Sequence, residues 1–339
     1  MINYPNNHWI VFVIMFMNKN KIFILVFALA ILFPNSIVLA AKIEQLDKTP
    51  IAGDYVIGPG KNEIRLNPGE QIVKILTVTN RYGKEMEFKI EIEDFAGSNN
   101  VQEPLVLLGQ EKGPYSLRDF LHPETVEFKL QHGDRISVPI TIIIPKDSQP
   151  GGLYGSIIVS TKPVVKPNLI DASTSNGNIT IVSRLASLFF VRVNGQVKEE
   201  GKISNFSVDK SFYTQPNIIF KTLFENSGNI YLNPYGLLKI ENIIGSKVDE
   251  IKIDPYFVMP GSVRQKEFIT KRSIMFGRYK ATLQMNRGYE NIVDERAVFF
   301  WVLPWKIVSM IILIVFFVVF ISKTAFDWLK NNFEIKRKI

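Results

Sequence analysis

The chain has no cysteine and only three histidines among its 339 residues. Without cysteine, the protein has no disulfide framework, no thiolate nucleophile and no cysteine-ligated metal. The histidines are His8, His122 and His132, and none is spaced for joint metal binding. The sequence also lacks a Ser/His/Asp order and a glycine-rich phosphate loop. We therefore predict no catalytic residue, no metal site and no cofactor, and expect a protein that is not an enzyme.

The net charge of +8 raises the question of nucleic-acid binding. Between residues 41 and 305, however, about 32 basic residues face about 30 acidic ones, so this stretch is nearly neutral. The excess positive charge lies at the two ends of the chain, where membrane-topology signals are found. We therefore expect no nucleic-acid partner.

The N-terminal region resembles an export signal. A basic segment beginning at Met17 precedes an apolar run of about a dozen residues, which is shorter than the roughly 20 that a membrane span needs. Small residues at Val38 and Ala40 fit a cleavage site. The pattern predicts a signal peptide over residues 1–40 with translation starting at Met17. An uncleaved membrane anchor is the alternative.

A second apolar run lies near the C-terminus. Residues 307–321 carry no charge, and the extended segment 304–322 has about 19 residues, which suffice to cross a bilayer as a helix. Trp301 and Trp305 fit an aromatic belt at one membrane surface, and the tail over residues 323–339 is basic. Because basic segments stay in the cytoplasm, we predict a single-pass cell-membrane protein with extracellular N-terminal domains and a cytoplasmic C-terminus. The alternative for this run is a buried core helix.

The region between these ends is rich in strand patterns. Apolar residues alternate with charged ones over residues 86–94, and Gly58-Pro59-Gly60 indicates a turn. Short strands at such spacing are typical of antiparallel sandwiches. We predict an all-β fold class: two tandem immunoglobulin-like antiparallel β-sandwiches, at residues 51–197 and 198–303, followed by a single transmembrane helix. A helical turn is expected near residues 116–121.

The order of several segments adds a family resemblance. "LNPGEQIVKILTVTN", "VPITIIIPKDSQPGGLYGSIIVS", "LFENSGNIYLNPYGLLKI" and "FGRYKATLQMNRGYE" precede "FFWVLPW" at the start of the terminal helix. This arrangement resembles the WxL-interacting surface proteins of Gram-positive bacteria. The resemblance implies a peptidoglycan-binding first domain, a second domain that binds a protein partner, and a membrane anchor. The sequence after "EIEDFAG" departs from the family pattern, which affects the expected glycan binding more than the fold.

Two groups in the first predicted sandwich invite functional interpretations. Glu91, Glu93 and Asp94 form an acidic strand edge, which can be a pair of catalytic carboxylates or a solvated face that resists aggregation. Tyr115 and Tyr154, with Phe120, can stack on sugar rings or belong to the core. We take the solvated face as the interpretation of the acidic group. Tyr115 and Tyr154 are kept as candidate ligand contacts.

A basic tract lies in the second predicted sandwich. Its candidate ligand contacts are Arg264, Lys266, Arg278 and Lys280, which can meet anionic wall polymer or lipid headgroups. The alternative is a solvated sheet face.

We therefore expect a membrane-anchored extracellular protein that tethers cell-wall material, such as peptidoglycan or another wall polymer, or a secreted surface protein. A chaperone-like protein that binds its client by edge-strand addition is the alternative. The sequence does not identify the ligand, the binding face or the oligomeric state.

Overall fold

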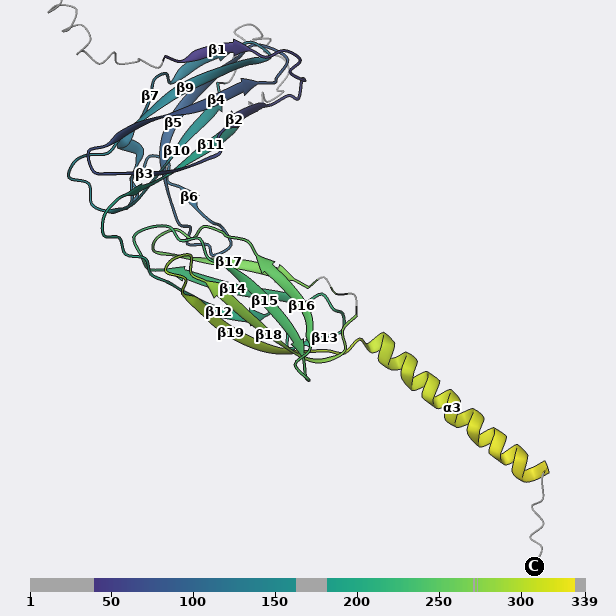
Figure 1. Cartoon of the computed structure of the whole chain (residues 1–339). Helices are drawn as coiled ribbons and strands as arrows, with labels where there is room; N and C mark the ends of the chain where they lie inside the picture. The colour runs from purple at the N-terminus through teal and green to yellow at the C-terminus, as the bar shows by residue number, and fades with distance from the viewer. Residues whose placement is uncertain (1–39, 163–181, 271, 273, 333–339) are drawn as a thin grey trace, which may run out of the picture. The chain divides into compact units, whose positions relative to one another are not determined.

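The computed structural model describes residues 40–162, 182–270, 272 and 274–332. The predicted signal peptide, most of the loop after residue 162 and the end of the basic tail lie outside these residues. The described part is mostly β-strand with one long terminal helix, so the predicted all-β fold class is confirmed (Figure 1).

The first sandwich is built from two sheets. One sheet has the strand order β1-β9-β4-β2 with β7 added beside β9, and the other has the order β3-β11-β10-β5-β6 with β8 beside β5. Most pairs are antiparallel, and β3 runs parallel to β11. The strands are β1 (Lys42–Gln45), β2 (Tyr55–Gly58), β3 (Lys61–Leu66), β4 (Gln71–Asn80), β5 (Met86–Ala96), β6 (Val106–Leu107), β7 (Leu121–Pro123), β8 (Glu127–Leu130), β9 (Asp134–Ile143), β10 (Gly151–Thr161) and β11 (Arg184–Val193).

The predicted turn at Gly58-Pro59-Gly60 is the point where the chain changes sheets. Before it, β2 pairs with the second half of β4; after it, β3 pairs with the second half of β11. In β3, Ile64 and Leu66 enter the core, whereas Lys61, Glu63 and Arg65 are exposed. This alternation is what a strand with one wet face requires. As a result, the first halves of β4 and β11 each lack a strand neighbour on one side.

The second sandwich also has two sheets. Their orders are β12-β14-β17 and β13-β19-β18-β15-β16. Besides seven longer strands, its described residues contain the two-residue strand β13, which was not predicted because so short a strand has no pattern of its own. The strands are β12 (Gly201–Val208), β13 (Phe212–Tyr213), β14 (Ile219–Asn226), β15 (Tyr235–Asn242), β16 (Lys247–Ile253), β17 (Ser262–Ile269), β18 (Gly277–Asn286) and β19 (Val293–Val302).

Each sandwich has its own large apolar core, and a third, smaller cluster joins them. Phe95, Tyr154 and Phe190 of the first sandwich are buried together with Met259 of the second. Tyr231 packs against the same cluster. Because this cluster belongs to both sandwiches, the domain boundary between residues 197 and 198 stays a prediction.

Two helical elements complete the structure. The 3₁₀ turn η1 (Arg118–Phe120) confirms the helical turn expected near residues 116–121. Helix α3 (Trp305–Asn332) begins at the predicted place but continues beyond residue 322, into the segment predicted as tail. Its segment Val308–Lys330 is long and apolar enough to cross a membrane, and none of its most apolar window is buried against the rest of the protein. A buried core helix is therefore not what this run forms.

Candidate functional site

The first half of β11 is an open strand edge. On one side β10 pairs along the strand from Arg184 onward, but on the other side β3 pairs only from Leu188 onward. Leu188 donates its N–H to the carbonyl of Gly60 at 3.0 Å. Because backbone groups alternate along a strand, the N–H of Ala186 points to the same, open side. Arg184 and Ala186 therefore offer backbone groups to an additional strand, whereas Ser187 is buried and donates its hydroxyl to the carbonyl of Pro59 at 2.6 Å.

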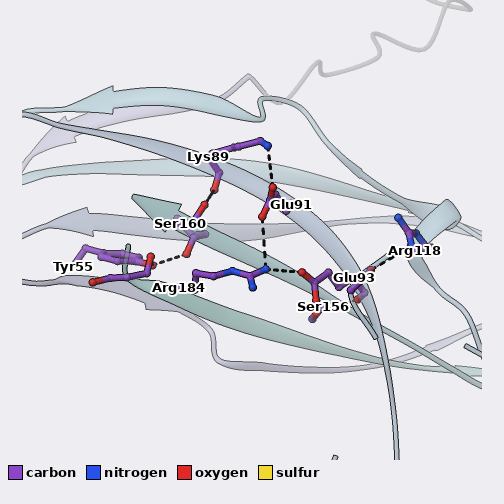
Figure 2. Close-up of polar contacts among 11 residues, drawn as sticks. Tyr55, Lys89, Glu91, Glu93, Arg118, Ser156, Ser160 and Arg184 are labelled. Carbon is purple, nitrogen blue, oxygen red and sulfur yellow. Dashed lines mark hydrogen bonds and ion pairs between the residues drawn. The ribbon is translucent and has the colours of Figure 1, made fainter. Parts of the chain in front are cut away.

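Side chains hold this open edge in place (Figure 2). The Arg184 guanidinium donates to the Glu93 carboxylate at 2.5 Å and lies 3.6 Å from Glu91 on β5. The Tyr55 hydroxyl on β2 donates to the carbonyl of Val159 on β10 and lies 3.3 Å from the carbonyl of Ser183, and burial raises the pKa of Tyr55 to about 12. The edge is thus ordered before any partner arrives, which lowers the entropic cost of binding.

The uncovered half of β4 carries an inward-facing charge, and the open half of β11 does not. On the uncovered half of β4, Lys74 alternates with Ile72 and the buried Leu76, so it faces the core side. Such an inward charge opposes the addition of a further strand. The corresponding position on β11 is Leu185, which is apolar and 40% exposed. By this criterion the open half of β4 has a feature that opposes strand addition, and the open half of β11 lacks it.

The edge of β17 is closed by another part of the chain. Its Gln265 donates its N–H to the carbonyl of Val101, in the segment after β5, at 2.6 Å. Gly97 in the same segment lies directly against Ser262 on β17.

The predicted acidic group is an ion-paired network rather than a pair of free carboxylates. Glu91 accepts a hydrogen bond from Lys89 at 2.9 Å, and this bond, more than any other interaction, lowers the pKa of Glu91. Glu93 is buried beneath Arg184, which differs from the solvated position expected for it. With each carboxylate held by a cation, the arrangement stabilises the strands and provides no acid–base pair.

Asp94 has a separate, structural role. Its carboxylate is fully buried and accepts hydrogen bonds from the N–H groups of Gly113, Leu117 and Arg118 at 3.0–3.1 Å. These bonds fix the segment that leads into η1. The sequence places Asp94 beside Glu93 but carries no sign of these distant amide donors.

Tyr154 does not have an exposed ring. It is 1% exposed and packs edge-on against Phe190 and Tyr115. Its hydroxyl accepts the N–H of Tyr231 at 2.7 Å, and burial raises its pKa. The ring has no free face for a sugar, so the alternative, a core aromatic, describes Tyr154 correctly. Tyr115 is half-buried beside it, and Phe120 is half-buried against the first core.

The basic tract is divided between two sheets. Arg264 and Lys266 lie on β17 and share a face with the buried Phe268, so both point to the core side, over the Tyr256 ring at 5.4 and 5.7 Å. Burial is also the main cause that lowers the pKa of Arg264. Their inward-facing charges therefore oppose the addition of a further strand at the edge of β17, as Lys74 does at that of β4.

The other two members of the tract lie on β18, in the opposite sheet. Arg278 is exposed and stacks on the Phe299 ring at 4.6 Å, and Lys280 is paired in register with Phe299. The chain reverses between β17 and β18, which separates residues that are close in sequence. The four candidates do not form one ligand surface.

A cleft of about 420 Å³ lies where the sandwiches meet. Arg65 on β3 and Arg192 on β11 are in register at its wall. Arg192 is paired with Glu199 at 3.0 Å, whereas Arg65 forms no ion pair within the described part of the chain. A free guanidinium in a cleft can hold a carboxylate. Sequence reasoning missed this pair because the two arginines come together only through parallel pairing of distant strands.

A search of the described residues finds no group of three or more His, Asp or Glu side chains placed to hold a metal ion.

Comparisons with known proteins identify no family from sequence. No family model and no curated protein matches the chain. Among solved structures, the class 5 fimbriae chaperone CfaA is 16% identical, with a TM-score of 0.34 over 74% of this chain and 100% of that one. The E. coli chaperone DraB is 15% identical, with a TM-score of 0.34 over 73% and 96%. The Pseudomonas aeruginosa chaperone CupB2 is 11% identical, with a TM-score of 0.31 over 71% and 98%. The likeness concerns the immunoglobulin-like fold class alone.

Proposed function

We propose that this protein is a non-catalytic, membrane-anchored binding protein that takes up an extended segment of a protein partner at the open edge of β11. The observation that carries the proposal is the edge at residues 184–186, which is ordered, has no strand paired on its outer side and has no inward-facing charge. A strand added there gains main-chain hydrogen bonds, and alternate side chains give specificity. The sequence predicted either a protein that tethers wall material or a surface protein, or a chaperone-like protein that binds its client by edge-strand addition. The proposal uses the binding mode of the second.

Helix α3 supplies the anchor in this proposal. Its apolar segment is free of contacts that would bury it, and the signal-like N-terminus implies that the sandwiches are exported. A tethered protein would then meet its partner at the outer membrane surface. The extracellular orientation and the cytoplasmic tail remain part of the proposal.

Binding of peptidoglycan or another wall polymer, which the resemblance to WxL-interacting proteins implies, stays a prediction. Its support is weaker than that for a protein partner because Tyr154 is buried and the basic tract is split. A secreted surface protein is the partner class that fits both the family resemblance and the open edge.

Site-specific photo-crosslinking in cells that produce the protein tests the proposal. A photoreactive amino acid at Leu185 should capture one short segment of a surface or secreted protein, mapped by mass spectrometry. The same group at Val73 is the matched control, because Val73 is similarly exposed and lies on the uncovered half of β4, which carries the inward-facing Lys74. A synthetic peptide of the captured segment should then slow amide exchange at Arg184 and Ala186 of the purified full-length protein.

The two positions give opposite expectations. Equal capture at Leu185 and Val73 would show contact without edge specificity and would contradict the proposal. So would a captured peptide that binds without protecting the amides of Arg184 and Ala186. Binding of isolated peptidoglycan, unchanged by Leu185→Lys, would instead favour the wall-polymer prediction.

A further inference from the structure

One end of the second sandwich is crowded with exposed apolar side chains. The turn after β15, the segment before β18 and the end of β19 lie together, because Gly277 pairs with Val302 and Asn242 pairs with Tyr279. The loop before β13 joins them, because Trp301 donates its N–H to the carbonyl of Ser211 at 2.9 Å. The exposed apolar residues in and beside these turns are Phe212, Ile243, Ile244, Ile269, Ile274, Phe276, Phe299, Trp301 and Leu303.

We call this set the apolar end. Its residues come from several turns and strand ends that are far apart in sequence, so it is a property of the fold and not of one apolar loop. Ile244, at the tip of the turn between β15 and β16, is 80% exposed. Exposed apolar patches of this kind mark surfaces that contact a partner or a membrane.

Helix α3 leaves from the same end. It begins at Trp305, three residues after the end of β19 at Val302. Leu303, between the two elements, donates its N–H to the carbonyl of Tyr213 at 2.7 Å. If α3 spans a bilayer, the apolar end is held within a few residues of the membrane surface. The chain itself therefore brings a lipid surface to these side chains.

Basic and aromatic side chains at this end match an anionic bilayer. Lys210, Arg272, Arg278 and Lys306 form no ion pair with any residue that the structure describes. Phe212 stacks on Trp301 with ring centroids 6.4 Å apart. Aromatic rings favour the headgroup layer, and lysine and arginine are attracted by anionic lipid.

We propose that the apolar end of the second sandwich is a membrane-docking surface that enters the headgroup layer of an anionic bilayer. The inference rests on the proposed anchor function of α3 and extends it. The second sandwich is then seated on the membrane by its own turns as well as tethered by the helix. Such seating limits its rotation and fixes which side of the protein faces away from the lipid.

The absence of native cysteine allows a direct test with single spin labels on the full-length protein. Ile244→Cys and Phe276→Cys place labels at the apolar end. Val293→Cys is the matched control, because Val293 is an exposed apolar residue at the opposite end of the same sheet. Val318→Cys places a label within α3. Each variant is reconstituted in vesicles of equimolar phosphatidylcholine and phosphatidylglycerol, and accessibility to oxygen and to a water-soluble nickel complex is measured.

We expect the labels at Ile244 and Phe276 to lose nickel accessibility and gain oxygen accessibility on reconstitution, while the label at Val293 stays exposed to nickel. The change should be smaller in pure phosphatidylcholine and after Arg272→Gln with Arg278→Gln. If the Val318 label is buried in lipid while the Ile244 and Phe276 labels stay in water, the docking surface is overturned and the anchor stands. If the Val318 label also stays in water, the anchor fails and the docking surface fails with it.

Discussion

The two ends of the second sandwich carry similar residues in opposite environments. At the end that meets the first sandwich, Met259 is buried and Tyr231 packs beside it, within a cluster shared with Tyr154 and Phe190. At the end that leads into α3, residues such as Ile244 and Phe276 are exposed. The first end has its apolar partner within the chain. The second end, beside a helix of membrane-spanning length, is not covered by any residue that the structure describes.

Because of this difference, the first end should determine the stability of the protein and the second end its binding to a surface. Apolar groups that are buried within the protein contribute to its free energy of unfolding, whereas exposed ones contribute only when something else covers them. Substitutions at the two ends should therefore affect different measurements.

The largest effect is expected from Tyr154→Ala. This change removes a buried aromatic ring from the cluster between the sandwiches, which should lower the free energy of unfolding by about 3–5 kcal/mol. Denaturant unfolding of the full-length protein in mild detergent measures it. Tyr154→Phe keeps the ring but leaves the N–H of Tyr231 without its acceptor, which should cost about 1–3 kcal/mol. Equal stability of Tyr154→Ala and the wild type would show that the cluster does not join the sandwiches.

Gly97→Ala should have a smaller effect at the same end. An added Cβ would overlap the Cβ of Ser262 and lie 3.1 Å from that of Met259, so the segment would have to move away from β17. Overpacking of this kind costs about 1–3 kcal/mol. Amide exchange at Gln265 should accelerate, because its N–H would lose the Val101 carbonyl. Gly60→Ala is the control, since its Cβ would meet nothing within 4 Å. Unchanged exchange at Gln265 would contradict the role of this segment.

Much of the fold could be predicted from local patterns. Alternation predicts β5 and the strands of the second sandwich, and the uncharged run predicts α3, because each depends on neighbours in sequence. The turn at residues 58–60 was also predictable, although its role in moving the chain between sheets was not.

The sites were less predictable because they depend on distant pairing. Tyr154 is buried by residues that include Tyr231, which is 77 positions away. Arg264 and Arg278 look like members of one basic tract, but the chain reversal between β17 and β18 places them in different sheets. The open edge of β11 exists only because β3 starts pairing late, and no local pattern shows where a neighbouring strand begins.

Alkaline titration gives a weaker test of the buried end. Burial, and then the negative charge of Glu63, raise the pKa of Tyr231 from about 10 to about 12. Because the folded pKa is raised, the stability that this tyrosine contributes is present below pH 10 and is lost as the pH rises from 10 towards 12. The ultraviolet absorbance of tyrosinate, compared with Tyr231→Phe, should show this residue ionising near pH 12. Glu63→Gln should lower that value, and ionisation near pH 10 in the wild type would show that Tyr231 is not packed in the cluster.

The smallest effect on stability is expected at the apolar end. Ile243→Ser with Ile244→Ser replaces two large apolar side chains, yet both are exposed, so the free energy of unfolding in mild detergent should change by no more than about 0.5 kcal/mol. The same pair of substitutions should reduce the lipid contact of a label at Phe276 in anionic vesicles. A loss of stability comparable to that of Tyr154→Ala would mean that these isoleucines are covered by the protein itself. In that case the two ends would not differ in kind, and the reason to look for a lipid partner would disappear.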